Sequence, residues 1–205
     1  MRLTVTTFVT LDGVYQAPGG PGEDDQGGFR HGGWSFPYAD EDFGAAMVGW
    51  FTKADAFLLG RKTYDIFVSH WPKVTDEADP IASRLNALPK YVVSGSQRPL
   101  DWHNSHLVTG DVSAEIAELR QQPGNELQVH GSGQLVHTLI RHGLADEYRL
   151  LVYPVILGTG KRLFPDGDIA AALRLTDSKT TGKGVQILTY EPAGPAQYGS
   201  FALGE

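Results

Sequence analysis

Three short turns in this sequence combine glycine, hydroxyl and cationic residues, and each follows a stretch that reads as a β-strand. They are Gly60-Arg61-Lys62-Thr63, Ser94-Gly95-Ser96-Gln97-Arg98 and Gly131-Ser132-Gly133-Gln134. Glycines let a backbone approach a ligand closely, while cations and the free N–H groups of a helix N-terminus attract phosphate. These residue types therefore indicate a site for a phosphorylated ligand.

Each turn also has an ordinary structural explanation. Arg61 stands four residues before Asp65, which is the spacing of a surface ion pair on a helix. The turn at 94–98 reads equally as a plain loop. The turn at 131–133 is an incomplete dinucleotide fingerprint, because Val136 takes the place of its third glycine. The combination of the three turns favours a ligand, since ligands of open α/β sheets gather where parallel strands end.

Alternating strand and helix patterns must bring these turns together. Runs of β-branched and apolar residues predict strands, and apolar residues at helical spacing predict helices. The predicted strands are 2–9, 56–59, 90–93, 107–108, 126–130, 147–155, 173–177 and 185–191. The predicted helices are 40–53, a short one that follows the turn at 60–64, 80–88, one from about 113 to about 120 and one that follows Gly133. This order predicts an α/β fold with a mostly parallel sheet covered on both faces, and the last strand pair predicts an antiparallel edge. Residues 18–38 read as a long Gly-rich loop, and 192–205 as a C-terminal tail.

Composition narrows the class of protein. The 205 residues are 41% hydrophobic and 20% charged, which suits one globular unit with a sizeable core over 1–191. A formal charge of −7 disfavours nucleic acid as a partner, and no apolar run is long enough for a signal peptide or a membrane span. There is no cysteine and no HExxH spacing among the histidines, so we expect no metal site. We therefore expect a cytoplasmic protein.

Taken together, the motifs resemble those of a known fold family. The segments 58–64, 92–96 and 129–135 are similar to the three nucleotide-binding segments of the dihydrofolate-reductase-like fold. Thr10-Leu11-Asp12-Gly13 and the segment 153–164 resemble the C-terminal reductase domain of the bifunctional riboflavin-biosynthesis deaminase/reductase. The similarity spans about 1–191 and includes no deaminase half. It implies a three-layer α/β fold with a mixed, mostly parallel sheet of about eight strands, NADPH as cofactor and often a homodimer.

The resemblance also implies roles for individual residues. The adenosine-side phosphates would be bound by Gly60, Arg61, Lys62 and Thr63, and the 2′-phosphate would lie beside Ser94. The pyrophosphate would contact Gly131, Ser132, Gly133 and Gln134. Thr7, in the first strand, would flank the nicotinamide.

Candidates on the substrate side come from loops. Asp12 is the leading catalytic candidate because it ends a strand beside the expected nicotinamide, although Asp-Gly is also an ordinary turn. Trp34, on the Gly-rich loop, could close over a flat substrate ring or simply anchor the loop, and His31 could supply a proton. Gly160 and Lys161 could hold an anionic group of the substrate or form a solvated turn.

Folate-reducing members of the fold carry a carboxylate at the position that Gly44 takes here. Asp40, Glu41 and Asp42 are close in sequence, but acidic residues also suit the first turn of a helix. We therefore expect an NADPH-dependent oxidoreductase that acts on a small heterocyclic molecule. The leading candidate substrate is 5-amino-6-(5-phosphoribosylamino)uracil. The alternative substrate is a pterin, folate or another small carbonyl or imine compound. Two alternatives of other classes are a non-catalytic NADP(H)- or flavin-binding protein and a structural, dimer-forming domain.

Overall fold

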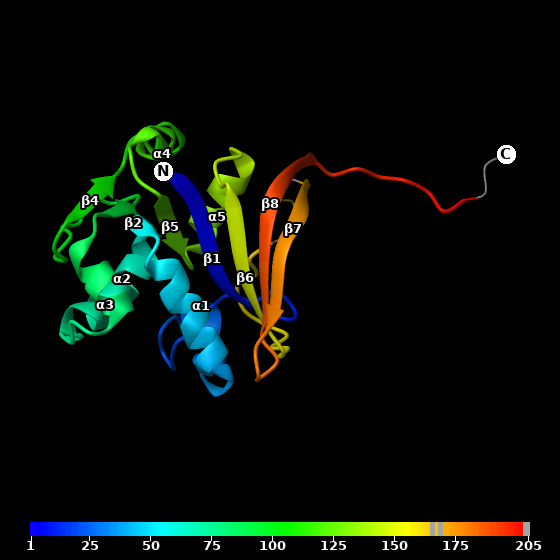
Figure 1. Cartoon of the computed structure of the whole chain (residues 1–205), viewed down its shortest axis with the longest axis horizontal. Coiled ribbons are helices and arrows are strands. Elements are labelled where there is room, and N and C mark those ends of the chain that lie inside the picture. Colours follow the sequence, from blue (N-terminus) through cyan, green and yellow to red (C-terminus); the bar gives the residue numbers. More distant parts are fainter. Residues whose placement is uncertain (165–166, 168–169, 203–205) are drawn as a thin grey trace.

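One eight-stranded sheet organises the computed structural model, which describes residues 1–164, 167 and 170–202. The strand order is β4-β3-β2-β5-β1-β6-β8-β7. The strands are β1 Arg2–Thr10, β2 Ala54–Gly60, β3 Lys90–Val93, β4 Ser105–Val108, β5 Glu126–His130, β6 Glu147–Tyr153, β7 Ala171–Thr180 and β8 Gln186–Pro195. All neighbours from β4 to β6 are parallel, whereas β8 is antiparallel to both β6 and β7 (Figure 1). The predicted mixed sheet with an antiparallel edge is therefore confirmed.

Helices cover both faces of this sheet and give it two hydrophobic cores. On one face lie α1 Glu41–Phe51, α2 Arg61–His70 and α3 Pro80–Ala87, and on the other lie α4 Val112–Gln121 and α5 Gly133–Arg141. β2 serves both cores, because Leu58 packs in the core under α4 and α5 while Phe57 and Leu59 pack in the other. A strand buried on both faces explains the continuous apolar run that the sequence shows there. No helix among the described residues is long and apolar enough to cross a membrane.

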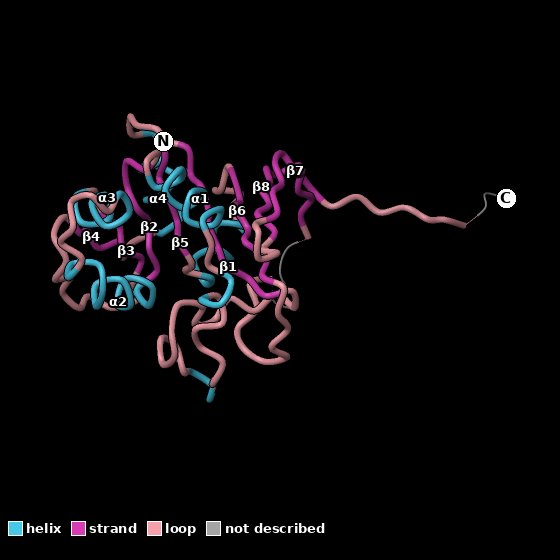
Figure 2. The backbone as a smooth tube through the Cα atoms, turned by 60° about the horizontal axis from the view of Figure 1, so that its bottom comes forward, coloured by secondary structure: helices cyan, strands magenta, loops and turns pink. Residues whose placement is uncertain are grey.

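Parallel strands end at one edge of the sheet, and the long loops gather beyond that edge (Figure 2). β2 ends at Gly60, where α2 begins at once, and β5 ends two residues before α5. β6 ends at Tyr153 rather than at 155 as predicted, because Pro154 has no N–H with which to continue the ladder. The turns singled out above therefore follow strands at this one edge.

The helices differ in how their first N–H groups are bonded. Aspartates cap α1, α3 and α4: the side chains of Asp40, Asp79 and Asp111 accept hydrogen bonds from the first turn of their helices. By contrast, α2 and α5 begin after Gly60 and Ser132 and have no side-chain cap. The first N–H groups of a helix need a partner, so these two helix starts are open to an acceptor from elsewhere.

Candidate active site

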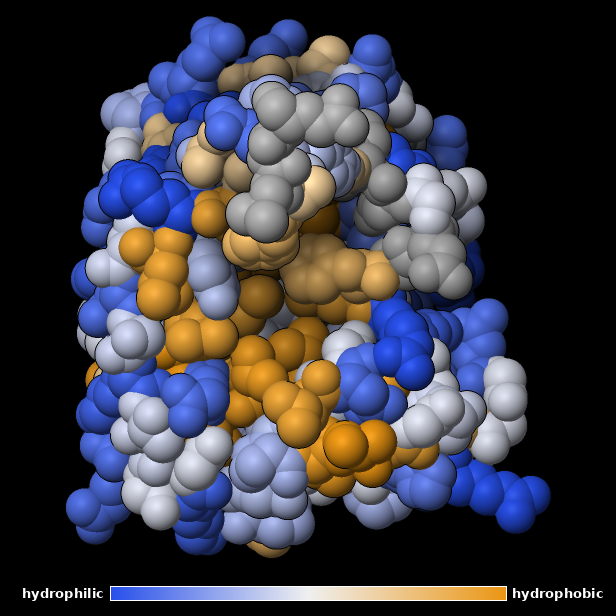
Figure 3. Space-filling view, turned by 90° about the vertical axis from the view of Figure 1, so that its right-hand side faces the viewer, coloured by the Kyte–Doolittle hydropathy of each residue, from blue (hydrophilic) through white to orange (hydrophobic). Residues whose placement is uncertain are grey.

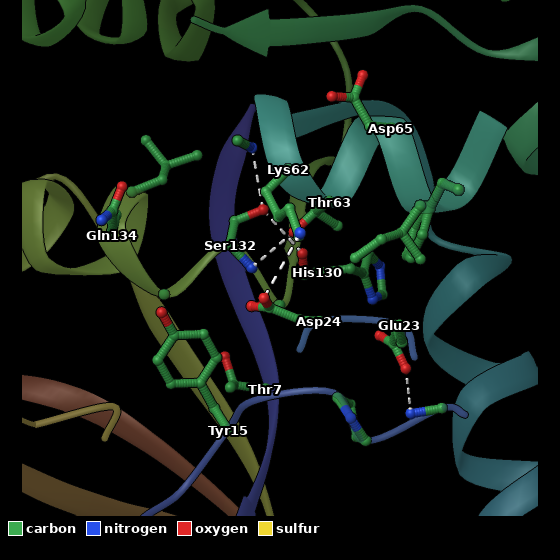
Figure 4. A pocket seen from close by; sticks show the side chains of 18 of the residues that line it. Thr7, Tyr15, Glu23, Asp24, Lys62, Thr63, Asp65, His130, Ser132 and Gln134 are labelled. Atoms are coloured by element: carbon green, nitrogen blue, oxygen red, sulfur yellow. Dashed lines mark hydrogen bonds and ion pairs between the residues drawn. The ribbon is translucent and has the colours of Figure 1, made fainter. Parts of the chain in front are cut away.

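A cavity of about 980 Å³ lies over the carboxyl ends of the parallel strands. The three turns and the first strand all reach it. Among the residues predicted to bind a ligand, those that line it are Thr7, Gly60, Arg61, Lys62, Thr63, Ser94, Gly131, Ser132, Gly133, Gln134 and Lys161. Figure 4 shows Lys62, Thr63 and Ser132 close together, with Asp24 and Tyr15 facing them from the loop side. The fold thus brings together segments that lie far apart in the sequence.

Ser132 joins two of the turns. Its hydroxyl accepts a hydrogen bond from the N–H of Gly60 at 3.0 Å and donates one to the carbonyl of His130, also at 3.0 Å. Its own N–H donates to the Thr63 hydroxyl at 3.1 Å. Because β2 and β5 are neighbours in the sheet, these bonds hold the starts of α2 and α5 side by side.

Two guanidinium groups meet at one wall of the cavity. Asp65 accepts hydrogen bonds from Arg61 at 2.8 Å and from Arg98 at 3.3 Å. Arg61 also donates to the carbonyl of Arg98 at 2.9 Å. The helix ion pair that was the ordinary explanation for Arg61 is therefore present, yet Arg61 still lines the cavity. Asp65 places two cations beside one another, which suits recognition of a dianionic phosphate.

The turn that carries Ser94 is closed on itself. The Ser94 hydroxyl donates to the carbonyl of Ser96 at 2.8 Å and accepts from the N–H of Ser96 at 3.1 Å. Ser94 is buried at the cavity wall with Arg98 of the same turn. This segment is therefore a loop bonded to itself that also forms part of the cavity wall.

The two glycines of the third turn are required for different reasons. Gly131 has a φ of +56°, a left-handed conformation that favours glycine. Gly133 has an ordinary conformation, but a Cβ there would lie 2.2 Å from Cζ of Tyr15. The aromatic ring of Tyr15 thus rests directly on the first residue of α5. The pattern of glycines had suggested only close approach of a pyrophosphate, and it gave no sign of this ring.

Two threonines on β1 line the cavity and carry hydroxyl groups that are not used in hydrogen bonds among the described residues. Thr6 and Thr7 are almost fully buried, and neither hydroxyl has a hydrogen-bond partner among the described residues. A buried hydroxyl without a partner costs free energy, and these two point to opposite faces of the sheet because they belong to successive residues of a strand. Thr7 was expected to flank the nicotinamide, and it lines the cavity.

His130 lines the cavity as a neutral side chain, and sequence reasoning did not select it. Its Nε2 lies 3.1 Å from Oε1 of Gln128, whose amide nitrogen donates to Glu126 at 2.6 Å and to the carbonyl of Trp50 at 2.7 Å. The Gln128 oxygen must therefore accept, so the hydrogen of His130 sits on Nε2 and the lone pair on Nδ1. Complete burial, with a smaller contribution from Arg149, lowers the pKa of His130 to about 3. This histidine offers an acceptor and not a cationic proton donor.

Asp12 does not line the cavity. Its carboxylate accepts hydrogen bonds from the Thr10 hydroxyl at 2.6 Å and from the N–H groups of Leu157 at 3.2 Å and Gly158 at 2.9 Å. The next residue, Gly13, has a φ of +81°. These contacts correct the expectation that Asp12 faces the substrate, because its carboxylate ties the first turn to the segment after β6. The Asp-Gly turn is the arrangement present.

Three other loop candidates also lie away from the cavity lining. Trp34 is buried, donates to the carbonyl of Gln16 at 2.7 Å and packs edge-to-face on Tyr153, so it anchors the loop as the alternative explanation held. Gly160 has a φ of +116°, and a Cβ there would meet the side chains of Val14 and Phe29. The ring of His31 contacts that of Phe29. Of the predicted substrate-side residues, only Lys161 lines the cavity.

Lys161 lines the cavity together with partners that the sequence did not suggest. Its ammonium group donates to Asp24 at 2.7 Å and to the side-chain oxygen of Gln26 at 2.6 Å. Lys62 approaches the other oxygen of Asp24 at 3.5 Å (Figure 4). The Asp24 carboxylate is buried, with only 8% of its side chain exposed. The Gly-rich loop thus delivers a carboxylate to two cations at the cavity.

The acidic residues before α1 have structural roles. Asp40 caps the helix and accepts from the N–H of Lys183, while Asp42 pairs with Lys179 and accepts from the N–H of Gly182. They fasten α1 to the turn between β7 and β8. Gly44, in contrast, does line the cavity. The position expected to carry a carboxylate in a folate reductase therefore lies at the site without one. Among the described residues, no three His, Cys, Asp or Glu side chains form a group that could hold a metal ion.

Known proteins are similar to this chain in sequence and in fold. The family model for the RibD C-terminal domain matches residues 2–187. The protein YyaP of Bacillus subtilis (strain 168) is 30% identical over 191 residues, which cover 92% of this chain and 94% of YyaP. A protein of Shewanella sp. PV-4 named for riboflavin biosynthesis superposes with a TM-score of 0.69 at 22% identity, covering 94% of this chain and 99% of that one.

The wider fold is also recognisable. Dihydrofolate reductase of Enterococcus faecalis, solved with NADP(H), matches with a TM-score of 0.56 at 12% identity, covering 94% of this chain and 96% of the reductase. This likeness confirms the dihydrofolate-reductase-like fold. The family match spans strands β1 to β7 and all the turns at the cavity, so the chain belongs to the family of the RibD C-terminal domain.

Proposed function

We propose that this chain is an NADPH-dependent reductase that acts on a small heterocyclic molecule. The observation that carries the proposal is the pair of uncapped helix starts, α2 and α5, held side by side at one cavity and accompanied by cations. Free N–H groups and the positive end of the helix dipole attract anions at such a place. A dinucleotide with a pyrophosphate and a 2′-phosphate matches two phosphate-binding places in one cavity.

The residues present fit the parts of this cofactor. Arg61, Arg98 and Ser94 share one wall and would hold the 2′-phosphate. Thr63, with the start of α5 from Gly131 to Gln134, would hold the pyrophosphate. Thr7 lines the cavity on β1 and would flank the nicotinamide. When bound, NADPH supplies the hydride, while the protein orients it and excludes water.

The substrate side is apolar on the α1 face. Phe8, Phe43, Met47 and Phe51 line it together with Gly44, and this surface suits a flat ring. Without a carboxylate at Gly44, the site lacks the group expected for a folate. This favours 5-amino-6-(5-phosphoribosylamino)uracil, in keeping with the family, over a pterin or folate. Oxidation of NADPH at 340 nm in the presence of each compound tests the choice.

Separate measurements of NADPH binding and of substrate turnover distinguish a reductase from a non-catalytic binding protein. We expect millimolar NADPH to raise the melting temperature, because a ligand that binds only the folded state stabilises it. Tight binding of NADPH or a flavin without turnover of any substrate would favour a sensor. No change in melting temperature would contradict the cofactor assignment and favour a structural domain.

We also propose that the chain forms a homodimer, as the resemblance implied. Figure 3 shows apolar side chains gathered on the face that carries the β7–β8 edge of the sheet. Leu173 and Leu175 of β7 are 38% and 49% exposed, and exposed apolar side chains on an edge strand favour burial against another chain. Sedimentation equilibrium should give twice the chain mass, and a monomer would contradict this proposal. The cytoplasmic location stays a prediction.

A further inference from the structure

A carboxylate from the Gly-rich loop occupies the space between two cations at the cavity. Asp24 receives a hydrogen bond from Lys161 at 2.7 Å and an ion pair from Lys62 at 3.5 Å. Its other bond comes from the N–H of Gln26, at 3.2 Å. In Figure 4 the carboxylate lies beside Thr63 and Ser132, where the starts of α2 and α5 meet. An anionic group thus already sits at the phosphate-binding end of the cavity.

The anionic groups that face the two cations are carboxylates, which are weaker anions than phosphate. Lys161 and Lys62 both pair with Asp24, Lys62 also interacts with the neighbouring Glu23, and burial alone would raise the pKa of Asp24. The hydrogen bonds from Lys161 and Gln26 outweigh burial and hold that pKa below its ordinary value, so Asp24 is ionised at neutral pH. A phosphate carries more charge and more acceptor oxygens than a carboxylate. Lys62 and Lys161 remain 59% and 31% exposed, so a ligand can reach them from solvent.

The part of the loop around Asp24 is held by different contacts from the part that anchors the loop. The later part of the loop is anchored independently, because Trp34 and Ser35 bond to the carbonyls of Gln16 and Pro18. Around Asp24, the chain is held chiefly by side-chain hydrogen bonds from Gln16 and Lys161. Bonds of this kind exchange partners more readily than backbone ladders do, because they involve few groups.

We propose that Lys62 and Lys161 form a phosphate subsite in which Asp24 is the resident counter-ion, and that a phosphate-bearing ligand binds there by displacing Asp24. This inference rests on the proposed function for the source of the phosphate, which is either the pyrophosphate of the dinucleotide or a phosphate on the substrate. Asp24 then lowers the affinity of the site for phosphate. The same exchange couples ligand binding to movement of the loop.

The test compares Asp24→Asn with Asp25→Asn. Asp25 is exposed and is the next residue of the loop, so its variant makes the same change in net charge away from the cavity. Calorimetric titrations use NADPH, inorganic pyrophosphate and ribose 5-phosphate. We expect Asp24→Asn to tighten binding of at least one of them by about tenfold, as removal of one charged competitor implies. Asp25→Asn should leave the affinities unchanged, and Lys161→Met should weaken the affinity that Asp24→Asn improves.

The pattern across ligands identifies the source of the phosphate. Tighter binding of NADPH and pyrophosphate alone places the dinucleotide at the subsite, whereas tighter binding of ribose 5-phosphate alone places the substrate there. If NADPH binds neither the unaltered protein nor Asp24→Asn, while ribose 5-phosphate binds more tightly to Asp24→Asn, the subsite stands and the cofactor proposal fails. Equal affinities in the two variants, or weaker binding by Asp24→Asn, would overturn the subsite.

Hydrogen exchange of the unaltered protein tests displacement without a variant. The N–H of Gln26 is bonded to Asp24, so it should exchange faster when at least one of NADPH, pyrophosphate and ribose 5-phosphate saturates the protein. Exchange at Gln26 that is unchanged or slower with all three ligands would overturn the displacement. This measurement holds even if Asp24→Asn proves unstable.

Discussion

The two sides of the cavity are built in different ways. On the phosphate side, the groups follow strands β2, β3 and β5 directly, and Ser132 locks two of the turns together with hydrogen bonds. On the loop side, Tyr15, Asp24 and Lys161 come from connecting segments and are held by packing and ion pairs. The sheet thus fixes one side in advance, while the loop side can exchange partners. We therefore expect cofactor affinity to depend chiefly on the first side and substrate choice chiefly on the second.

The largest expected effect comes from a substitution where the two sides touch. In Gly133→Ala, the new Cβ would lie 2.2 Å from the ring of Tyr15, and the ring would have to move. We expect a loss of about 1–3 kcal/mol in the free energy of unfolding and a clear loss of NADPH affinity. Urea unfolding and calorimetry measure the two effects.

A helical glycine with open space provides the control for this substitution. Gly49 in α1 has no atom within 4 Å of an added Cβ, so Gly49→Ala should be neutral or stabilising. Adding Tyr15→Ala to Gly133→Ala should restore part of the lost stability. If Gly133→Ala behaves like Gly49→Ala, the ring does not rest on α5.

A substitution confined to the phosphate side should change affinity without changing the fold. Arg61→Ala removes a guanidinium from the wall that it shares with Arg98, and we expect NADPH to bind at least about tenfold more weakly. NADH lacks the 2′-phosphate, so its affinity should change much less. An unchanged affinity for NADPH would mean that Arg61 serves only as the partner of Asp65, and equal losses for the two nucleotides would place Arg61 away from the 2′-phosphate.

The neutral histidine at the cavity predicts a dependence of stability on pH. The folded protein holds His130 unprotonated, with a pKa of about 3, whereas the unfolded chain protonates it near 6.5. Below pH 6.5 the unfolded state therefore binds more protons, and stability should fall as the pH falls. Urea unfolding at pH 7 and pH 5 should show this loss, and it should be smaller in His130→Gln. An equal loss in the variant would assign it to other groups.

The smallest effect is expected at Asp12. Its carboxylate accepts three hydrogen bonds within the first turn and the segment after β6, so Asp12→Asn should cost about 1 kcal/mol of stability. The turnover number of the reductase should stay within a few-fold of that of the unaltered protein. A loss of turnover by two or more orders of magnitude with normal stability would restore Asp12 to the reaction.

Local patterns were sufficient for the sheet and for the phosphate side. Alternating strands and helices set the topology, and each turn begins at or directly after the last residue of its strand, so their meeting at one edge could be predicted. The extent of β7, which runs from Ala171 to Thr180, was underestimated because its exposed residues do not alternate clearly in polarity.

The loop side could not be predicted in the same way. Asp24 and Tyr15 reach the cavity because of the path of the chain, which depends on tertiary contacts such as Trp34 with Gln16. His130 looked like the last residue of a strand, and its role depends on a hydrogen bond to Gln128 in the same strand. Lys161 was selected for an anionic group, but its partner Asp24 lies 137 residues away in sequence.

A crystal structure with bound NADPH tests the central claim most directly. The account predicts the 2′-phosphate beside Arg61 and Arg98, the pyrophosphate at the starts of α2 and α5, and the nicotinamide beside Thr7. NADPH bound elsewhere on the molecule, or no bound NADPH at millimolar concentration, would contradict it.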